Sequence, residues 1–307
     1  MTSRAVLRLS QAALALQVLL VVSGSAVRVT GSGLGCPTWP RCTGGSLTNT
    51  AALGGHGAIE FGNRLLAVLM ELVGIALVVA VHRHAGPRAW RRLALTQAMV
   101  VPLQAVVGGL LVLSGLNPWV LIVHFLASFP LVLAAATLLR RVLDEQRPGR
   151  AGADDPRGTL RLLTGALVAS GAAVLVVGSL VTGTGPHAGS RDIARLPFDP
   201  REITQLHADL VWLLLGLVAA TALVSRGTPV WRWSRVLVAL VLAQGALGYW
   251  QYFRGVPPTL VVLHVTGATL VFTTACWAAL SVRPAPAPPP RSAPPPLLSA
   301  AGTTTAR

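Results

Sequence analysis

The sequence predicts an all-α polytopic membrane protein in which eight transmembrane helices form two pseudo-symmetric four-helix bundles. Three observations support this prediction: the composition is strongly apolar, the apolar residues fall in long runs, and the second half of the chain repeats features of the first. Of the 307 residues, 53% are hydrophobic and 11% are charged, and the mean hydropathy is +0.64. One soluble core does not need this much apolar surface, so we expect the lipid bilayer to surround the chain.

Eight apolar segments are each long enough to cross roughly 30 Å of hydrocarbon, which takes about 20 helical residues. A small-residue stretch at the end of the first segment, Ser23 to Ala26, is similar to a signal-peptide cleavage site. The apolar run before it exceeds the usual about 7 to 15 residues of such a peptide, so we expect a retained helix. The predicted spans cover approximately 8–27, 58–81, 93–113, 119–139, 160–182, 203–224, 235–253 and 259–281.

The basic residues predict the orientation of these spans. All 25 are arginines, and 18 of them fall on one side if the N-terminus is inside. This positive-inside bias predicts that both termini are cytoplasmic, in a bacterial plasma membrane. The arginines lie in short loops and in the tail instead of along one helix face, so we expect no nucleic-acid partner. The inner arginines are Arg4, Arg8, Arg83, Arg88, Arg91, Arg92, Arg140, Arg141, Arg147, Arg150, Arg157, Arg161, Arg226, Arg232, Arg235, Arg283, Arg291 and Arg307.

Matched motifs divide the chain into two halves. Each half has an even number of spans, so both halves enter the membrane in the same direction and are related by an axis along the membrane normal. The matched pairs are TGSG at 30–33 with TGTG at 182–185, Gln104 with Gln244, and His124 with His264. In both halves the histidine follows the glutamine by 20 residues. Two similar bundles result, and each can hold a site.

The repeat sets the expected domain boundaries. Residues 1–139 form the N-terminal bundle and residues 160–281 form the C-terminal bundle. The segment 140–159 mixes charge with glycine and proline, which is typical of a cytoplasmic linker. The segment 282–307 is rich in proline and alanine and cannot form a packed core, so we expect a disordered tail.

Three histidines lie inside spans at one depth. His124, His207 and His264 are about four or five residues from the outer ends, or roughly 6 to 8 Å deep at 1.5 Å per residue. An intramembrane imidazole is a functional hypothesis, although a hydrogen-bonded structural histidine is the alternative. Two neutral imidazoles from neighbouring helices can bind opposite faces of a haem iron, so we expect His207 and His264 to be axial ligands. Zinc would need further ligands.

The first bundle is expected to differ from the second. Opposite His124 the repeat places Asn63, and an asparagine is a poor haem ligand. Glu60, Asn63 and Arg64 share one side of the second span. The carboxylate and guanidinium could neutralise each other as packing elements. Alternatively, Glu60 serves a reacting substrate while Arg64 steadies its charge or binds a propionate. Because the two bundles carry different residues at their sites, we expect the two sites to have different functions.

Six segments together resemble the haem A synthase family from Gly24 to about Leu280: TGSGLGCPTWPRC, IEFGNRLLA, GLNPWVLIVHF, TGTGPHAG, QLHADL and LHVTGA. The resemblance implies a membrane enzyme that oxidises a ring methyl of haem O to the formyl group of haem A for terminal oxidases. It implies successive hydroxylations with oxygen taken from water. It also implies haem b on the iron ligands His207 and His264, haem O as the substrate on His124, and Glu60 as the catalytic residue.

This chain departs from the family at one position. The family commonly reads E-x-x-H-R in the second span, whereas this chain reads EFGNR at 60–64. His56 could replace the missing ligand, but it lies about 10 Å above Asn63 at helical rise, and Gly57 can end the helix between them. We therefore expect a five-coordinate substrate haem on His124, with an open position for reaction.

Two cysteines, Cys36 and Cys42, lie in the first outer loop, in an oxidising compartment if the predicted topology holds. Their C-x5-C spacing lacks the C-x-x-C-H of covalent haem attachment and any second ligand pair for zinc. We therefore expect a disulfide, which could cover the first bundle's haem site. Two roles of the expected disulfide remain as alternatives: it only holds the loop together, or it takes part in redox chemistry.

Two other functional classes compete with the enzyme. One is a diheme membrane cytochrome that transfers electrons without chemistry on the porphyrin. The other is a tandem-repeat transporter, which is weakened because no span is visibly interrupted at mid-depth in both halves. The farnesyl transferase that produces haem O is a possible partner of the enzyme, and the sequence is compatible with a homo-oligomer. It points to no particular electron acceptor.

Overall fold

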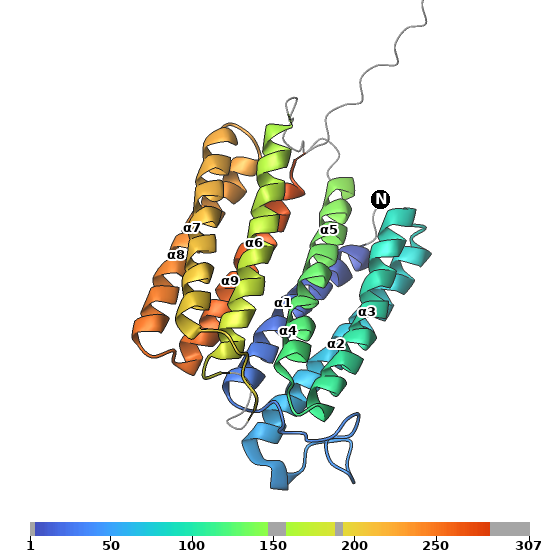
Figure 1. Cartoon of the computed structure of the whole chain (residues 1–307). Helices are drawn as coiled ribbons and strands as arrows, with labels where there is room; N and C mark the ends of the chain where they lie inside the picture. Colours follow the sequence, from blue (N-terminus) through green and yellow to red (C-terminus); the bar gives the residue numbers. More distant parts are fainter. Residues whose placement is uncertain (1–3, 147–157, 188–192, 283–307) are drawn as a thin grey trace, which may run out of the picture.

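The structure, a computed structural model, describes residues 4–146, 158–187 and 193–282, and its regular elements are helical (Figure 1). Within these residues, eight helical stretches are long and apolar enough to cross a membrane, which confirms the predicted fold class. In chain order the elements are α1 (Arg4–Val29), η1 (Ala51–Leu53), α2 (Gly54–Arg83), α3 (Arg88–Leu113), α4 (Pro118–Leu126), α5 (Ser128–Gln146), α6 (Thr159–Thr184), α7 (Pro200–Val224), α8 (Val230–Phe253) and α9 (Pro258–Ala279).

The fourth span is broken in two, whereas the sequence predicted one helix over 119–139. Helix α4 ends at Leu126 and α5 begins at Ser128. Pro130 explains the break, because it has no N–H to donate to the carbonyl of Leu126 and its ring crowds that carbonyl. The corresponding position of the second half is Leu270, and α9 runs through it without interruption. The break is therefore specific to the first half.

Helix α5 also continues to Gln146, into the segment predicted as a linker. There Arg140 Nε and Asp144 Oδ1 form an ion pair one helical turn apart, at 3.0 Å. The rest of the predicted linker, 147–157, and all but the first residue of the predicted tail, 283–307, lie outside the described residues. The division of the chain into domains stays a prediction.

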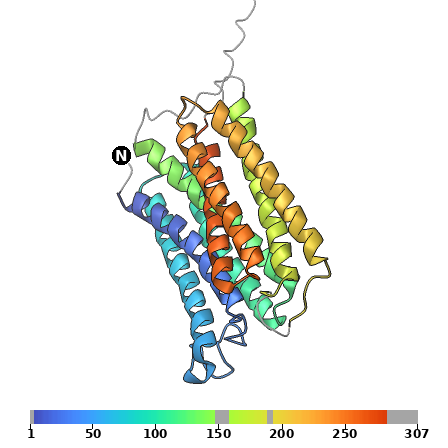
Figure 2. The same cartoon turned by 90° about the vertical axis from the view of Figure 1, so that its left-hand side faces the viewer.

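The spans pack as two closed rings of four, which lie side by side in two views (Figures 1 and 2). In the first ring, α1 and α3 each pack against both α2 and α5. In the second, α6 and α8 each pack against both α7 and α9. Each ring has its own apolar core, which includes Met70 and Leu138 in the first and Leu167 and Leu237 in the second.

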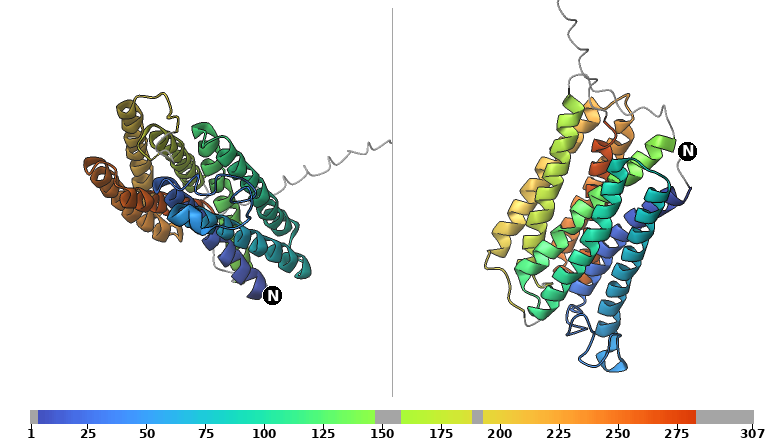
Figure 3. Two further views of the ribbon diagram at one scale, coloured as in Figure 1. Left: turned by 90° about the horizontal axis from the view of Figure 1, so that it is seen from below. Right: turned by 90° about the vertical axis from the view of Figure 1, so that its right-hand side faces the viewer.

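The two rings meet along a shared apolar seam. Helix α9 contacts α1 and α5, and α4 contacts α6. The seam cluster consists of Val21, Phe129, Leu175, Phe272 and Cys276, and the rings of Phe129 and Phe272 are 5.3 Å apart. Cys276 is a buried free thiol in this cluster. Figure 3 shows the two groups of four helices from below and from the side.

Large apolar side chains cover the outer surface of the helices. Met99 is 71% exposed and Leu103 on the same helix is 58% exposed, and Trp212 and Leu213 on α7 are similarly exposed. A soluble monomer rarely exposes continuous apolar surface of this extent. The chain is a multi-pass membrane protein, and these side chains face lipid.

Candidate functional site

Three helices that carry histidines begin in the same way. Helices α4, α7 and α9 each have a proline in the first turn, where the missing N–H costs nothing and the fixed φ favours helix. The prolines are Pro118, Pro200 and Pro258, and the histidines that follow six, seven and six residues later are His124, His207 and His264. At 1.5 Å per residue, each imidazole lies roughly 10 Å along its helix. The three rings therefore lie at a similar height.

Two of these helix starts are also capped by side chains. Asn117 Oδ1 accepts hydrogen bonds from the backbone N–H groups of Trp119 at 3.0 Å and Val120 at 3.4 Å. Asp199 Oδ1 accepts from Arg201 at 2.8 Å and Glu202 at 3.1 Å. The N–H donors of Glu202 and then Arg201 hold the pKa of the exposed Asp199 carboxyl below its usual value. The caps fix where α4 and α7 start, and so where their histidines lie.

His207 and His264 face each other across the second ring. Their ring centroids are 6.4 Å apart and their planes are inclined by 62°. A metal bound by two imidazoles at roughly 2 Å from each nitrogen places the ring centroids about 6 Å apart. The pair can therefore hold one iron between them.

The three imidazoles differ in their polar partners. The Nδ1 atom of His124 is buried and has no hydrogen-bond partner in the part of the chain that the structure describes. The His207 imidazole, by contrast, interacts with the backbone of Val174, and His264 Nδ1 is 3.3 Å from Gln244 Nε2. A buried polar atom without a partner is costly, so His124 fits a residue that binds a further group.

No group of three or more His, Cys, Asp or Glu side chains within the described ranges could hold a bare metal ion. A haem needs fewer protein ligands, because the porphyrin occupies four positions on the iron and leaves two for imidazoles. The paired histidines therefore fit a haem better than zinc.

Each histidine ring lies against a glycine of a neighbouring helix. A Cβ on the glycine would lie within van der Waals contact of Cε1 of the histidine, so a larger residue would push the ring away. The pairs are Gly108 with His124 at 3.3 Å, Gly178 with His207 at 3.0 Å, and Gly248 with His264 at 3.3 Å. Gly108 and Gly248 are equivalent in the repeat, since each follows its repeated glutamine by four residues, whereas Gly178 follows no glutamine and was not marked by the repeat.

The repeated glutamines hold the helices of His124 and His264. Gln104 Nε2 donates to the His124 carbonyl at 3.0 Å, and Gln244 Nε2 donates to the His264 carbonyl at 2.8 Å. The spacing of 20 residues thus corresponds to a repeated interhelical hydrogen bond.

The first ring has Asn63 where the second has His207, and its amide contacts α1. Ser23 Oγ donates to Asn63 Oδ1 at 2.6 Å. The repeat did not indicate Ser23, because the matching residue of the second half, Val177, is apolar. Asn63 is therefore tied to a neighbouring helix.

His56 does not approach this position. Its Nδ1 is 2.9 Å from Ser32 Oγ, and the residue is exposed near the start of α2. Helix α2 runs through Gly57 without the interruption that the sequence suggested. The helical rise therefore separates His56 from Asn63 by about 10 Å along a continuous helix.

Glu60 is buried and bound on both carboxylate oxygens. Its Oε1 accepts from Arg64 at 2.5 Å, and its Oε2 accepts from the backbone N–H of Cys36 at 2.7 Å. The residue is only 5% exposed. The structure thus brings Glu60 together with the outer loop and with Arg64.

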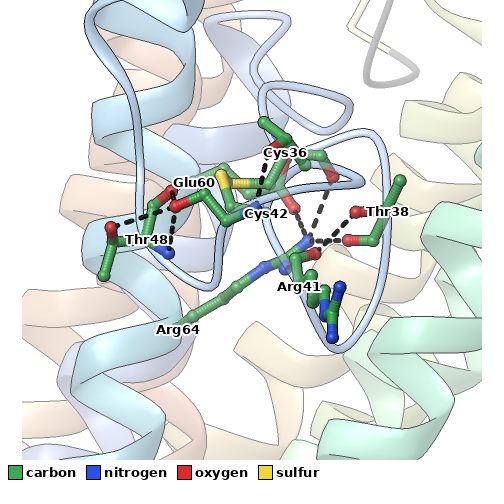
Figure 4. The surroundings of a disulfide bond; sticks show 9 residues. Cys36, Thr38, Arg41, Cys42, Thr48, Glu60 and Arg64 are labelled. Carbon is green, nitrogen blue, oxygen red and sulfur yellow. Dashed lines mark hydrogen bonds and ion pairs between the residues drawn. A yellow bond between two sulfur atoms is a disulfide. The ribbon is translucent and has the colours of Figure 1, made fainter.

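Arg64 binds three carbonyls of the same loop (Figure 4). Its guanidinium donates to the carbonyls of Cys36 at 3.1 Å, Thr38 at 3.1 Å and Arg41 at 3.2 Å. Cys36 and Cys42 are joined in a disulfide, which closes the loop around these acceptors. The loop is therefore fixed on α2 beside Glu60.

Comparisons with known proteins cover both rings. The family described as cytochrome oxidase assembly protein, COX15-CtaA, matches residues 8–190. Heme A synthase of Sphingopyxis alaskensis is 30% identical over 318 residues, which span 86% of this chain and 88% of that protein. Heme A synthase of Bacillus cereus strain G9842 is 28% identical and covers 85% of this chain and 82% of its own length. Protoheme IX farnesyltransferase of Haloquadratum walsbyi is 28% identical over 131 residues, only 26% of its length.

Proposed function

This chain belongs to the COX15-CtaA family of cytochrome oxidase assembly proteins, and we propose that it is a haem A synthase. The enzyme oxidises a ring methyl of haem O to the formyl group of haem A. Two relatives that match most of the chain carry this name. The observation that carries the proposal is the His207–His264 pair at 6.4 Å in one ring, beside a ring with a single such histidine.

The reaction adds oxygen from water and removes electrons. In each hydroxylation the methyl carbon gains a hydroxyl group from water and releases two protons, while two electrons pass to an external electron acceptor. The second hydroxylation gives a geminal diol, and loss of water from the diol leaves the formyl group. The first ring is the proposed site for haem O, with His124 on its iron.

Glu60 is the proposed proton acceptor of this reaction. It is a buried carboxylate on the same helix as Asn63, less than one turn away. Arg64 and the Cys36 N–H hold its two oxygens in a fixed orientation, which suits a group that must meet a substrate proton at one place. Arg64 acts through Glu60 and through the outer loop, as a positioning residue.

The second ring is the proposed site of a resident haem b. His207 and His264 would bind its iron from α7 and α9, which lie diagonally across the ring. The fit is supported by the 6.4 Å between the two imidazole centroids and by the glycines Gly178 and Gly248, which pack on the two imidazoles. Bound there, haem b supplies one-electron redox chemistry.

The proposed location is the bacterial plasma membrane, with both termini in the cytoplasm. The arginine distribution supports this orientation. The disulfide loop, at the lower end of the structure in Figure 1, then lies on the outer face. The enzyme that produces haem O is the proposed partner on the substrate side, and the segment shared with a protoheme farnesyltransferase supports that link.

The proposal is tested by supplying haem O to cells that express this chain and determining the mass of the extracted porphyrins. A haem A synthase yields a product that has gained one oxygen and lost two hydrogens. The Glu60→Ala variant should accumulate haem O instead. A protein that binds haem but yields no haem A would be a membrane cytochrome, and the proposed enzyme would be wrong.

A further inference from the structure

The second ring shows what a histidine at the position of Asn63 requires. Gly178 of α6 lies behind the His207 ring, and a Cβ there would be 3.0 Å from Cε1. A glycine is therefore needed at this point of α6 for the imidazole to reach the centre of the ring.

The first ring also has a glycine at the corresponding position, but no imidazole packs against it. Gly24 of α1 corresponds to Gly178 in the packing of the helices, two residues away from the register of the TGSG and TGTG motifs, because the buried residues of α1 and α6 match in this register. Val21 and Leu175, three residues earlier, both lie in the seam cluster. The following serines also match, since each donates to the carbonyl three residues before it, at 2.7 Å. Among the described residues, no heavy atom outside Gly24's own stretch of helix lies within 4 Å of a Cβ at position 24. The position of a Cβ on Gly24 is therefore open, whereas a Cβ on Gly178 would meet the His207 imidazole.

The polar groups at this place are an amide and a hydroxyl. Asn63 accepts from Ser23 at 2.6 Å, so its side chain is held at α1. An amide oxygen suits hard cations and is a poor ligand for haem iron. An amide and a hydroxyl can both donate and accept hydrogen bonds, so together they can bind a small uncharged molecule.

We propose that Ser23, Gly24 and Asn63 form a binding site for a small uncharged ligand of haem iron, on the face of the substrate haem opposite His124. This inference rests on the proposed function, because that function places haem O in the first ring. The substrate haem then keeps one exchangeable position, whereas both positions of haem b are taken by imidazoles. The polarity and steric access of such a pocket decide what an iron can bind.

The site is tested with carbon monoxide and imidazole as probes. The purified protein is loaded with haem until each of the two helical rings holds one haem, which is measured as two haems per chain. After reduction, we expect one carbon monoxide per two haems in the difference spectrum. In the oxidised protein, imidazole should convert one high-spin haem to low spin.

The Asn63→His variant closes the site, because Gly24 leaves room for the imidazole of the new histidine. It should bind two haems and lose carbon monoxide binding at least tenfold. The neighbouring Gly62→Ala variant, in which the added Cβ meets no heavy atom within 4 Å, should bind carbon monoxide as the wild type does. The His207→Asn variant gives the second ring the asparagine that the first ring has. It should raise the number of carbon monoxide molecules bound per two haems from one toward two.

Two results would overturn the inference. One is a wild-type protein with two haems that are both low spin and bind no carbon monoxide, a measurement that needs no variant to fold. The other is carbon monoxide binding that persists unchanged in Asn63→His. If haem A forms in either case, the proposed function survives and only the ligand site is wrong. If no second haem binds and no haem A forms, both fail.

Discussion

The indole ring of Trp39 packs directly on Gly109 of α3. A Cβ at position 109 would lie 2.7 Å from Cγ of Trp39. The preceding residue, Gly108, faces the His124 ring. The disulfide loop and the histidine helix therefore meet α3 at adjacent residues, while Arg64 ties the other side of the loop to α2. The loop spans the two helices beside the first-ring site.

Gly109→Val should displace Trp39 and loosen the loop. The loop holds Glu60 through the N–H of Cys36, so we expect haem A formation to fall severalfold. Haem b in the second ring should be retained, as its optical spectrum would show. Gly45→Ala is the control in the same loop, because its Cβ meets no heavy atom within 4 Å. Equal haem A yields in the two variants would mean that the Trp39 contact does not matter.

Gly178→Ala should disturb the axial ligation of haem b. The added methyl group would lie 3.0 Å from Cε1 of His207, closer than ordinary contact, so the ring must shift. We expect a partly high-spin spectrum or a lower haem content. Gly165→Ala on the same helix has an open Cβ position and should leave the spectrum unchanged. A normal low-spin haem b in Gly178→Ala would show that this glycine does not position the ligand.

Sequence patterns predicted much of the fold because membrane spans are long and uniformly apolar. The break between α4 and α5 was missed, although Pro130 was visible, because a proline inside a transmembrane helix is often tolerated. The spacing of Gln104 to His124 predicted that the halves correspond. It could not show that the glutamine binds the histidine's carbonyl, since that contact depends on how two helices pack.

Arg64→Ala should destabilise the outer loop. The guanidinium binds Glu60 and three loop carbonyls, and hydrogen bonds to a charged group contribute about 2 kcal/mol each in favourable cases. Because Arg64 is partly exposed, we expect a loss of about 2 kcal/mol in total. Thermal unfolding in detergent and protease cleavage within the loop measure the effect. Arg64→Lys keeps the charge but cannot reach all these acceptors, so it should restore only part of the stability.

Asp199→Asn tests the cap of α7. The pKa of Asp199 is lowered in the folded protein by the N–H groups of Glu202 and Arg201. Its contribution to stability is therefore full above the ordinary aspartate pKa of about 3.9 and is lost as the pH falls through the lower folded value. The protection factors of the amides in the first turn of α7, relative to their intrinsic exchange rates, should fall below about pH 4 in the wild type. The asparagine variant retains the cap, so a similar loss of protection in that variant would exclude Asp199 as its cause.

Residues of the candidate site were predictable to different degrees. Glu60 and Arg64 were paired correctly by their helical spacing, since residues four apart on a helix are neighbours. Their shared contact with Cys36 was not predictable, because the path of an irregular loop leaves no periodic signal. The partner of Asn63 was missed for a related reason: a serine inside an apolar helix, such as Ser23, most often bonds its own backbone.

Haem content and spin state of the purified protein test the central claim most directly, namely that His207 and His264 bind one haem iron between them. The wild type should contain a low-spin haem b with two imidazole ligands. The variants His207→Ala and His264→Ala should each lose that haem or convert it to high spin. An unchanged low-spin spectrum and haem content in both variants would contradict the account.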